Sequence, residues 1–268
     1  MREVTVLTSN TVEREVDVGT NKGATNYLLT DGAHAWNTSR GMVIAIMLLP
    51  FFICLSGVLA ALMGKEAYKW FIGEDRFAEN IQVILWIISF VFSFNVARSQ
   101  VRKGDYLFGA LYVLLCGGIF FIIGEELSWG QRILGWTTPE SLKMMNKQNE
   151  TNIHNIYEIG ETIKWIHLMV GAYGTFAPFI VLGVKSLQRY QKEVSLLVPH
   201  LTLLPYFFIP FVWRVYRNFF EDPQRYRFVI QEYSEVIELV IASAFMFFLL
   251  YQNRQIKKMS DDNSNGSS

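Results

Sequence analysis

The sequence predicts an all-α, polytopic integral membrane protein. Apolar residues make up 51% of its 268 residues, and the mean hydropathy is positive at +0.22. Composition alone does not separate this chain from a soluble one. The distribution does, because the apolar residues come in continuous blocks of about twenty, which is the length that crosses a bilayer as a helix. We therefore expect a single membrane domain, at residues 41–252, with about six transmembrane helices.

Six apolar blocks define the expected spans, at approximately residues 41–63, 80–97, 106–125, 165–185, 196–214 and 235–252. The first block contains Pro50, which we expect to kink that helix without breaking it. The fifth contains Pro199, Pro205 and Pro210, and each interior proline removes a backbone hydrogen bond. The fifth span is therefore expected to be irregular, either to suit packing or to line a polar cavity.

The segments outside the spans are polar. Residues 1–40 lack an early apolar core, so we expect no cleavable signal peptide, and the tail at 253–268 is predicted to be disordered. A long polar connection at about 125–164 follows the third span, and it is either re-entrant or interfacial. Within it, Thr138 and Pro139 are typical of a helix start, as N-cap and first helical residue.

Charge predicts the orientation, although the formal net charge is zero. The segments after the second, fourth and sixth spans are short and basic, with Arg98, Arg102, Lys103, Lys185, Arg189, Lys192, Arg254, Lys257 and Lys258. The positive-inside rule then places both termini in the cytoplasm and the other loops outside. We expect a bacterial inner-membrane protein surrounded by the lipid bilayer. No long basic run is present, so nucleic-acid binding is not expected.

The most informative motif, at residues 124–132, follows the third span and contains Glu125, Glu126, Ser128, Trp129, Gln131 and Arg132. An ionisable group at a helix centre costs about 2.5–3.5 kcal/mol on insertion scales. Glu125, Ser128, Trp129 and Arg132 would share one face if the third helix continued to Leu134. One interpretation is a charged cap in which Arg132 neutralises a glutamate. The other is a site in which Glu125 or Glu126 is a general base.

A second polar cluster lies in the long connection and contains Asn146, Gln148, Glu150, His154 and Asn155. Amide side chains at this density are costly to bury without partners and unnecessary on a plain surface. Glu150 and His154 stand four residues apart, a spacing that can hold a divalent metal or orient an imidazole. Such a pair is common by chance, so we predict no metal site and leave the cofactor unknown.

A third cluster, Glu232, Glu235 and Glu238, leads into the sixth span. One interpretation is purely structural: carboxylates at a helix N-terminus are stabilised by the helix dipole. Glu238, however, lies within the apolar block and needs a partner, for which Arg214 and Arg217 are the candidates. The predicted topology places all three clusters on one side of the membrane, and this convergence favours a site.

Two cysteines and two histidines fall within predicted spans. Cys54 and Cys116 are interpreted as small packing residues, with no disulfide expected. His167 and His200 are interpreted as hydrogen-bonded core or interface residues.

The motif residues from Glu125 to Arg132, followed by those from Asn146 to Asn155, resemble a pattern of uncharacterised bacterial multi-pass membrane proteins. This resemblance implies a fold but no activity. A weaker similarity is to the CPBP intramembrane proteases, which carry two adjacent glutamates and then an arginine after three residues. Here five residues separate Glu126 from Arg132, and the expected Phe-x-x-x-His and His-x-x-x-Asn elements are absent. That family therefore serves as an analogy only.

The predicted function is hydrolysis or group transfer on a lipid-like substrate at the extracytoplasmic face. Glu125 or Glu126 would be the base, His154 a second acid/base and Arg132 an anion binder. The expected substrate-binding residues are Ser128, Trp129, Gln131, Arg132, Asn146, Gln148, Glu150, Asn155, Arg214, Glu235 and Glu238. Two alternatives are a small proton-coupled transporter and a non-catalytic partner of another membrane protein.

Overall fold

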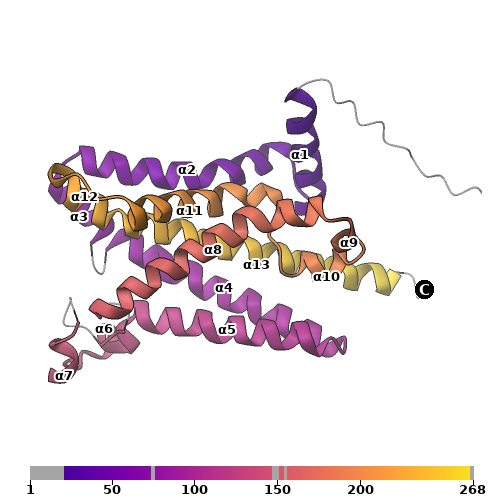
Figure 1. Cartoon of the computed structure of the whole chain (residues 1–268). Helices are drawn as coiled ribbons and strands as arrows, with labels where there is room; N and C mark the ends of the chain where they lie inside the picture. The colour runs from indigo at the N-terminus through magenta and orange to yellow at the C-terminus, as the bar shows by residue number, and fades with distance from the viewer. Residues whose placement is uncertain (1–20, 74–75, 147–150, 154–155, 266–268) are drawn as a thin grey trace, which may run out of the picture.

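The computed structural model of the chain describes residues 21–73, 76–146, 151–153 and 156–265, and the regular structure in these ranges is helical. Five helices in these ranges are long and apolar enough to cross a membrane, which supports a multi-pass membrane protein. They contain α2 (Arg40–Leu62), α4 (Phe77–Arg102), α5 (Tyr106–Glu126), α8 (Tyr157–Gly183) and α13 (Ser234–Asn265) (Figure 1). Each corresponds to one predicted span.

The predicted fifth span, 196–214, is not one helix. Helix α10 (Gln191–Ser195) ends before Pro199, a 3-10 turn η2 (Leu201–Leu203) follows, and α11 (Leu204–Phe219) starts with Pro205 in its first turn. A proline suits that position because the first turn has no hydrogen-bonded N–H to lose. Helix α11 has 16 residues and Pro210 inside it, so it is shorter than the five candidate spans. The count of six crossings stays a prediction.

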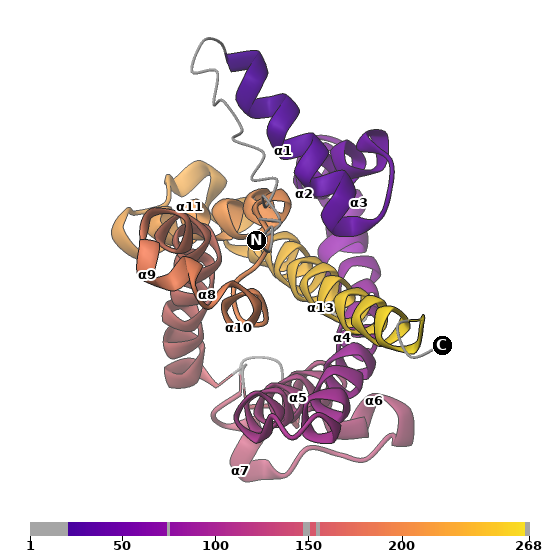
Figure 2. The same ribbon diagram turned by 90° about the vertical axis from the view of Figure 1, so that its right-hand side faces the viewer.

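Helix α13 lies between two helix pairs, α4–α5 on one side and α8–α11 on the other (Figure 2). Helix α2 packs against α11 and α13. The close approach of α8 to α11 depends on Gly171 and Gly174. A Cβ atom on Gly171 would lie 2.8 Å from the backbone nitrogen of Phe211, and one on Gly174 would overlap the ring of Phe207. Small residues commonly allow such contacts between membrane helices.

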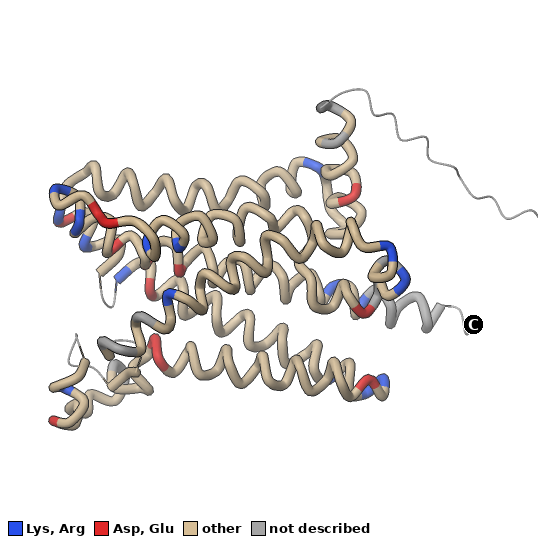
Figure 3. The backbone as a smooth tube through the Cα atoms, in the orientation of Figure 1, with Lys and Arg blue, Asp and Glu red and all other residues tan. Residues whose placement is uncertain are grey.

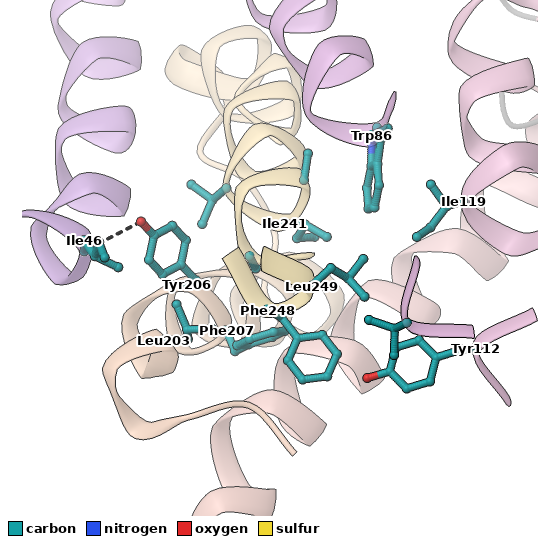
Figure 4. Packing of buried hydrophobic residues seen from close by; sticks show 14 of the residues in the cluster. Ile46, Trp86, Tyr112, Ile119, Leu203, Tyr206, Phe207, Ile241, Phe248 and Leu249 are labelled. Carbon is teal, nitrogen blue, oxygen red and sulfur yellow. Dashed lines mark hydrogen bonds between the residues drawn. The ribbon is translucent and has the colours of Figure 1, made fainter. Parts of the chain in front are cut away.

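The apolar core surrounds α13, with side chains from α4, α5 and α11, and it includes Trp86, Ile119, Tyr206, Ile241 and Leu249 (Figure 4). The Tyr206 hydroxyl donates to a backbone carbonyl of α2, so its polar atom is satisfied inside the core. Large apolar side chains also cover the outer faces of α2, α4, α5 and α8. Charged residues gather at the two ends of the bundle (Figure 3). This distribution fits helices surrounded by hydrocarbon.

We name the two ends of the bundle by what they carry. The Glu126 end has α3 (Lys65–Ile72), α6 (Gln131–Leu134), α7 (Glu140–Lys143) and α12 (Arg227–Glu232). The α1 end has α1 (Asn21–Trp36), α9 (Lys185–Gln188), α10 and the C-terminal part of α13 (Figure 1). Which end faces the cytoplasm stays a prediction from the charges.

Two polar segments contain more helix than expected. Helix α1 lies within residues 1–40, and α13 continues to Asn265, through most of the tail predicted to be disordered. The two helices are joined at the α1 end, where Arg254 donates to the carbonyl of Trp36 at 3.1 Å and Gln255 to that of Ala35 at 2.9 Å. The sequence from Ser234 to Asn265 contains neither glycine nor proline. Beyond its apolar block, α13 is therefore held by its contact with α1 and contains no helix-breaking residue, so the helix continues.

Candidate functional site

Helix α5 ends at Glu126 and does not continue to Leu134. The chain turns through left-handed conformations at Ser128 (φ 46°), Trp129 (φ 52°) and Gly130 (φ 92°). Glu125, Ser128, Trp129 and Arg132 were expected to share one helical face only if the helix continued to Leu134, and that condition is not met. Glycine adopts such angles readily, but serine and tryptophan need compensating contacts.

Trp129 has those contacts because it folds back onto the last turn of α5. Its Nε1 donates to Oε1 of Glu125 at 2.6 Å, and its ring meets Phe121 edge-on with 5.5 Å between centroids. A Cβ atom on Gly124 would lie 2.9 Å from the Trp129 ring, so the glycine makes room for it. The indole thus packs over the last turn of the helix.

Glu125 is an anchor for the returning loop. The residue is only 4% exposed. While Oε1 accepts from Trp129, Oε2 accepts from the backbone nitrogen of Ile153 at 2.6 Å. Hydrogen bonds to a carboxylate are among the stronger ones in proteins. This geometry supports a structural role for Glu125, which holds the loop through an indole and a backbone N–H.

Gln131 joins the two arms of the loop. Its Nε2 donates to Oγ1 of Thr138 at 2.9 Å, and its Oε1 accepts from the backbone nitrogen of Thr151 at 2.7 Å. The prediction that Thr138 caps a helix from Pro139 is wrong. Helix α7 covers only Glu140–Lys143 without a side-chain cap, and the Thr138 hydroxyl also accepts from Thr151.

Asn146 and Ser128 belong to the same loop network. The Asn146 amide donates to the backbone carbonyl of Asn152 at 2.9 Å and to its side-chain oxygen at 2.7 Å. The Asn152 amide in turn donates to Oγ of Ser128 at 3.3 Å. All three residues are buried. These amides therefore satisfy one another inside a folded loop.

Four predicted site residues, Gln148, Glu150, His154 and Asn155, lie outside the described residues, and so does the side chain of Arg132. The proposed Glu150–His154 pair is therefore not tested. Within the described part of the chain, no group of three or more His, Cys, Asp and Glu residues has a metal-binding arrangement.

A second centre lies among α8, α11 and α13. Arg214 is only 3% exposed, and its Nη2 contacts Nδ1 of His167 at 2.9 Å and Oε1 of Glu238 at 3.3 Å. A guanidinium can only donate, so Nδ1 of His167 accepts and the proton of a neutral ring is on Nε2. His167 Nδ1 also lies 3.9 Å from the Glu238 carboxylate. Arg214 therefore pairs with Glu238, and Arg217 pairs instead with Asp222.

Glu235 joins this centre to the end of α5. Its carboxylate interacts electrostatically with those of Glu238, Glu126, Glu79 and Glu232. Glu126 thus approaches α13, while its neighbour Glu125 bonds to the loop, because adjacent helical residues point about 100° apart. We call Glu126, His167, Arg214, Glu235 and Glu238 the ionisable centre.

Sequence reasoning did not place two residues in this environment. His167 was expected to be a hydrogen-bonded core or interface residue, which it is, but without a charged partner. Glu79 was not considered. Glu79 lies in the first turn of α4, and His167 lies about three turns into α8. Ionisable residues in such segments are costly and commonly functional, and that was the available signal.

Comparison with protein-family models, curated proteins and solved structures finds no match to this chain.

Proposed function

We propose that this chain is a membrane-embedded hydrolase or transferase that acts on a lipid-like substrate at the Glu126 end. The observation that carries the proposal is the ionisable centre, in which a buried arginine binds His167 and Glu238 beside further carboxylates. A purely structural ion pair needs two residues on two helices. Here four helices contribute, and ionisable groups are costly at such depth unless they are used.

The geometry suggests a division of roles. Arg214 occupies Nδ1 of His167, which leaves Nε2 to exchange a proton with a substrate. Glu126 is the preferred general base from the motif, because Glu125 holds the loop. Glu235 and Glu238 would bind the polar part of the substrate. The predicted roles of His154 as acid/base and Arg132 as anion binder remain part of the proposal.

The surroundings favour a site open to one side over a transport pathway. Between the ionisable centre and the α1 end, the described core residues are mostly apolar, among them Trp86, Ile119, Ile241 and Leu249. The two buried serines of α4 donate hydrogen bonds to backbone carbonyls, Ser89 to that of Leu85 and Ser93 to that of Tyr112. A proton pathway across the membrane needs continuous polar lining or water.

A proton-coupled transporter is the second candidate. Four other carboxylates are near enough to Glu235 for their charges to influence it, and such a group favours balance by protons, cations or nearby basic groups. The break between α10 and α11 adds the irregular helix seen in many transporters.

The test compares cells that lack the chain with cells that carry the wild type, Glu126→Gln, His167→Gln or Glu140→Gln. Glu140 is the matched control, because its exposed carboxylate pairs only with Lys143 among the described residues. An enzyme predicts an altered lipid profile with the first two variants and a normal profile with the control. Normal expression and an unchanged profile for both site variants would contradict the proposal. Uptake driven by a pH jump in proteoliposomes, lost in Glu126→Gln, would support the transporter instead.

A further inference from the structure

The corner of the Glu126 end where α3 meets α12 is basic. Helix α3, the 3-10 turn η3 (Gln224–Tyr226) and α12 carry two acids and four bases, which are Lys65, Lys69, Arg225 and Arg227. All four bases are exposed, and Figure 3 shows basic residues gathered at this corner. One of the acids, Glu232, lies near enough to Lys69 for that charge to influence it. The corner therefore has an excess of positive charge.

Three of these bases, Lys65, Arg225 and Arg227, have no carboxylate partner among the described residues. Two of them lie over aromatic rings instead. Nζ of Lys65 is 5.6 Å from the ring centroid of Phe228, and the guanidinium carbon of Arg225 is 5.4 Å from that of Tyr226. A ring attracts a cation through its quadrupole but does not neutralise the charge. These bases are therefore available to an anion.

Contacts between α3 and α12 hold the bases in one surface. The buried Tyr68 of α3 donates from its hydroxyl to the carbonyl of Val229 at 2.7 Å. Its ring meets Phe228 edge-on, with 6.4 Å between centroids, and Phe228 in turn lies under the ammonium of Lys65. The bases of α3 and those of η3 and α12 therefore belong to one packed unit, although they are far apart in the sequence.

The corner lies at the level where lipid headgroups begin. Helix α2, a candidate membrane span, ends at Leu62, and α3 follows almost directly with Lys65. Helix α12 leads into α13, which is another candidate span. Exposed aromatic side chains lie among the bases, with Trp70 58% exposed and Tyr226 53%. Tryptophan and tyrosine favour the boundary between hydrocarbon and water, so the bases next to them are placed to meet headgroups.

We propose that the α3–α12 corner binds the headgroup of an anionic glycerophospholipid, whose phosphate accepts hydrogen bonds from Lys65, Arg225 and Arg227. Charge-assisted bonds from such side chains to phosphate are strong, and basic residues at a membrane surface attract anionic lipids. A zwitterionic headgroup suits the corner less well, because its ammonium would lie beside the same bases. The proposal goes beyond the proposed function and does not depend on it, because none of these residues belongs to the ionisable centre.

The test uses the full-length protein, purified in detergent and mixed with phosphatidylglycerol or with phosphatidylcholine of the same acyl chains. Native mass spectrometry measures how much of each lipid is bound as its concentration is raised. We expect the protein to bind phosphatidylglycerol more tightly than phosphatidylcholine. This preference should weaken as the concentration of ammonium acetate rises, because salt screens exposed charges.

Two triple variants separate a site at this corner from a general attraction to positive charge. The site variant combines Lys65→Gln, Arg225→Gln and Arg227→Gln. The control removes three exposed bases at and just after the end of α4, at the opposite end of the bundle, by Arg98→Gln, Arg102→Gln and Lys103→Gln. The site variant should weaken the binding of phosphatidylglycerol about a hundredfold, or about fivefold for each base. The control should leave the tightest binding unchanged.

Equal binding of the two lipids by the wild type would overturn the proposal. Equal losses in the two triple variants would also overturn it, because they would show attraction to any basic end of the bundle. Displacement of phosphatidylglycerol by inorganic phosphate at millimolar concentration would identify a free phosphate, and not a lipid, as the ligand. An acidic protein that copurifies with the wild type but not with the site variant, together with no lipid preference, would identify a protein partner instead.

Discussion

Arg214 on α11 contacts Glu238 on α13 at 3.3 Å, and the arginine side chain is 3% exposed. The same guanidinium contacts His167 on α8 at 2.9 Å. A charge buried this fully needs compensation, because desolvation costs several kcal/mol per ion. One arginine therefore ties three helices together and places an imidazole beside the carboxylates of the ionisable centre.

The Arg214–Glu238 pair predicts an asymmetric response to substitution. Glu238→Leu removes a carboxylate that pairs with the buried arginine, and it should destabilise the protein by about 3–5 kcal/mol. Arg214→Met combined with Glu238→Leu removes both charges and should recover most of that loss. Thermal unfolding in detergent, followed by tryptophan fluorescence, measures the difference. A single variant as stable as the double variant would show that the pair is not energetically coupled.

Trp129 is predicted to hold the loop after α5 in place. Trp129→Phe keeps an aromatic ring against Phe121 but removes the N–H that bonds to Glu125, a loss of about 1.5–3 kcal/mol for a charged acceptor. Amide hydrogen exchange of residues 151–153 should then accelerate, because Glu125 also holds the N–H of Ile153. Trp136→Phe changes a tryptophan of equal exposure in the same loop but keeps the bond from Trp129 to Glu125, so it should leave the exchange unchanged.

The five long helices were predictable because hydrocarbon imposes a minimum length on any apolar helix that crosses it. The prolines likewise predicted an irregular fifth span. The turn after α5 was not predictable in detail, since Ser128 and Trp129 adopt positive φ for tertiary reasons. Local sequence favours continuation of the helix, and the bond from Trp129 to Glu125 favours the turn.

The proximity of Glu126 to Glu235 was expected only as a shared side of the membrane. Hydropathy gives the order of the spans but not which helices are neighbours. That α5 and α13 both pack against α4 was therefore not foreseeable. His167 was expected to be a hydrogen-bonded core or interface residue, and it is hydrogen-bonded to Arg214. Its partner was not foreseeable, because whether a histidine in an apolar helix meets a charged residue depends on that same packing.

The α8–α11 contact should be sensitive to one added methyl group. In Gly171→Ala, the new Cβ would lie 2.8 Å from the backbone nitrogen of Phe211, which cannot move aside as a side chain can. We expect a loss of about 1–3 kcal/mol. Gly117→Ala on α5 is the matched control, since nothing lies within 4 Å of its new Cβ, and it should be neutral or slightly stabilising. Equal melting temperatures for the two variants would contradict close packing at Gly171.

Docking of α1 should weaken in mild acid. His200 lies between α10 and η2, outside the five candidate spans, with its ring nitrogens at 3.1 Å from Asp31 and 2.9 Å from Thr202. Burial lowers the pKa of His200, and Asp31 opposes this with a smaller effect. The other groups at this end are Tyr251, whose ring faces the imidazole, and Arg254, which binds the Trp36 carbonyl.

The direction follows from the lowered pKa of His200. An undocked His200 takes up a proton as the pH falls below about 6.5, while the docked one resists it. Stability of the docked state is therefore full above that pH and declines from there to the folded-state pKa. Fluorescence anisotropy of a dye on Tyr27→Cys, an exposed position of α1, measures this on a cysteine-free background. His200→Gln should abolish the pH dependence of docking. If the dependence persisted in this variant, His34 would be its source instead.

The orientation of the bundle is testable with single cysteines and an impermeant thiol reagent, after Cys54 and Cys116 are replaced. Ser141 and Gln224 are exposed at the Glu126 end, and Ser186 is exposed at the α1 end. The positive-inside rule predicts labelling of the first two positions from outside intact cells and of Ser186 only after the membrane is opened. The reverse pattern would place the ionisable centre in the cytoplasm and direct the search toward soluble metabolites. Labelling of Ser141 and Gln224 from opposite sides would contradict a bundle in which both belong to one end, and with it the single site built from α5 and α13.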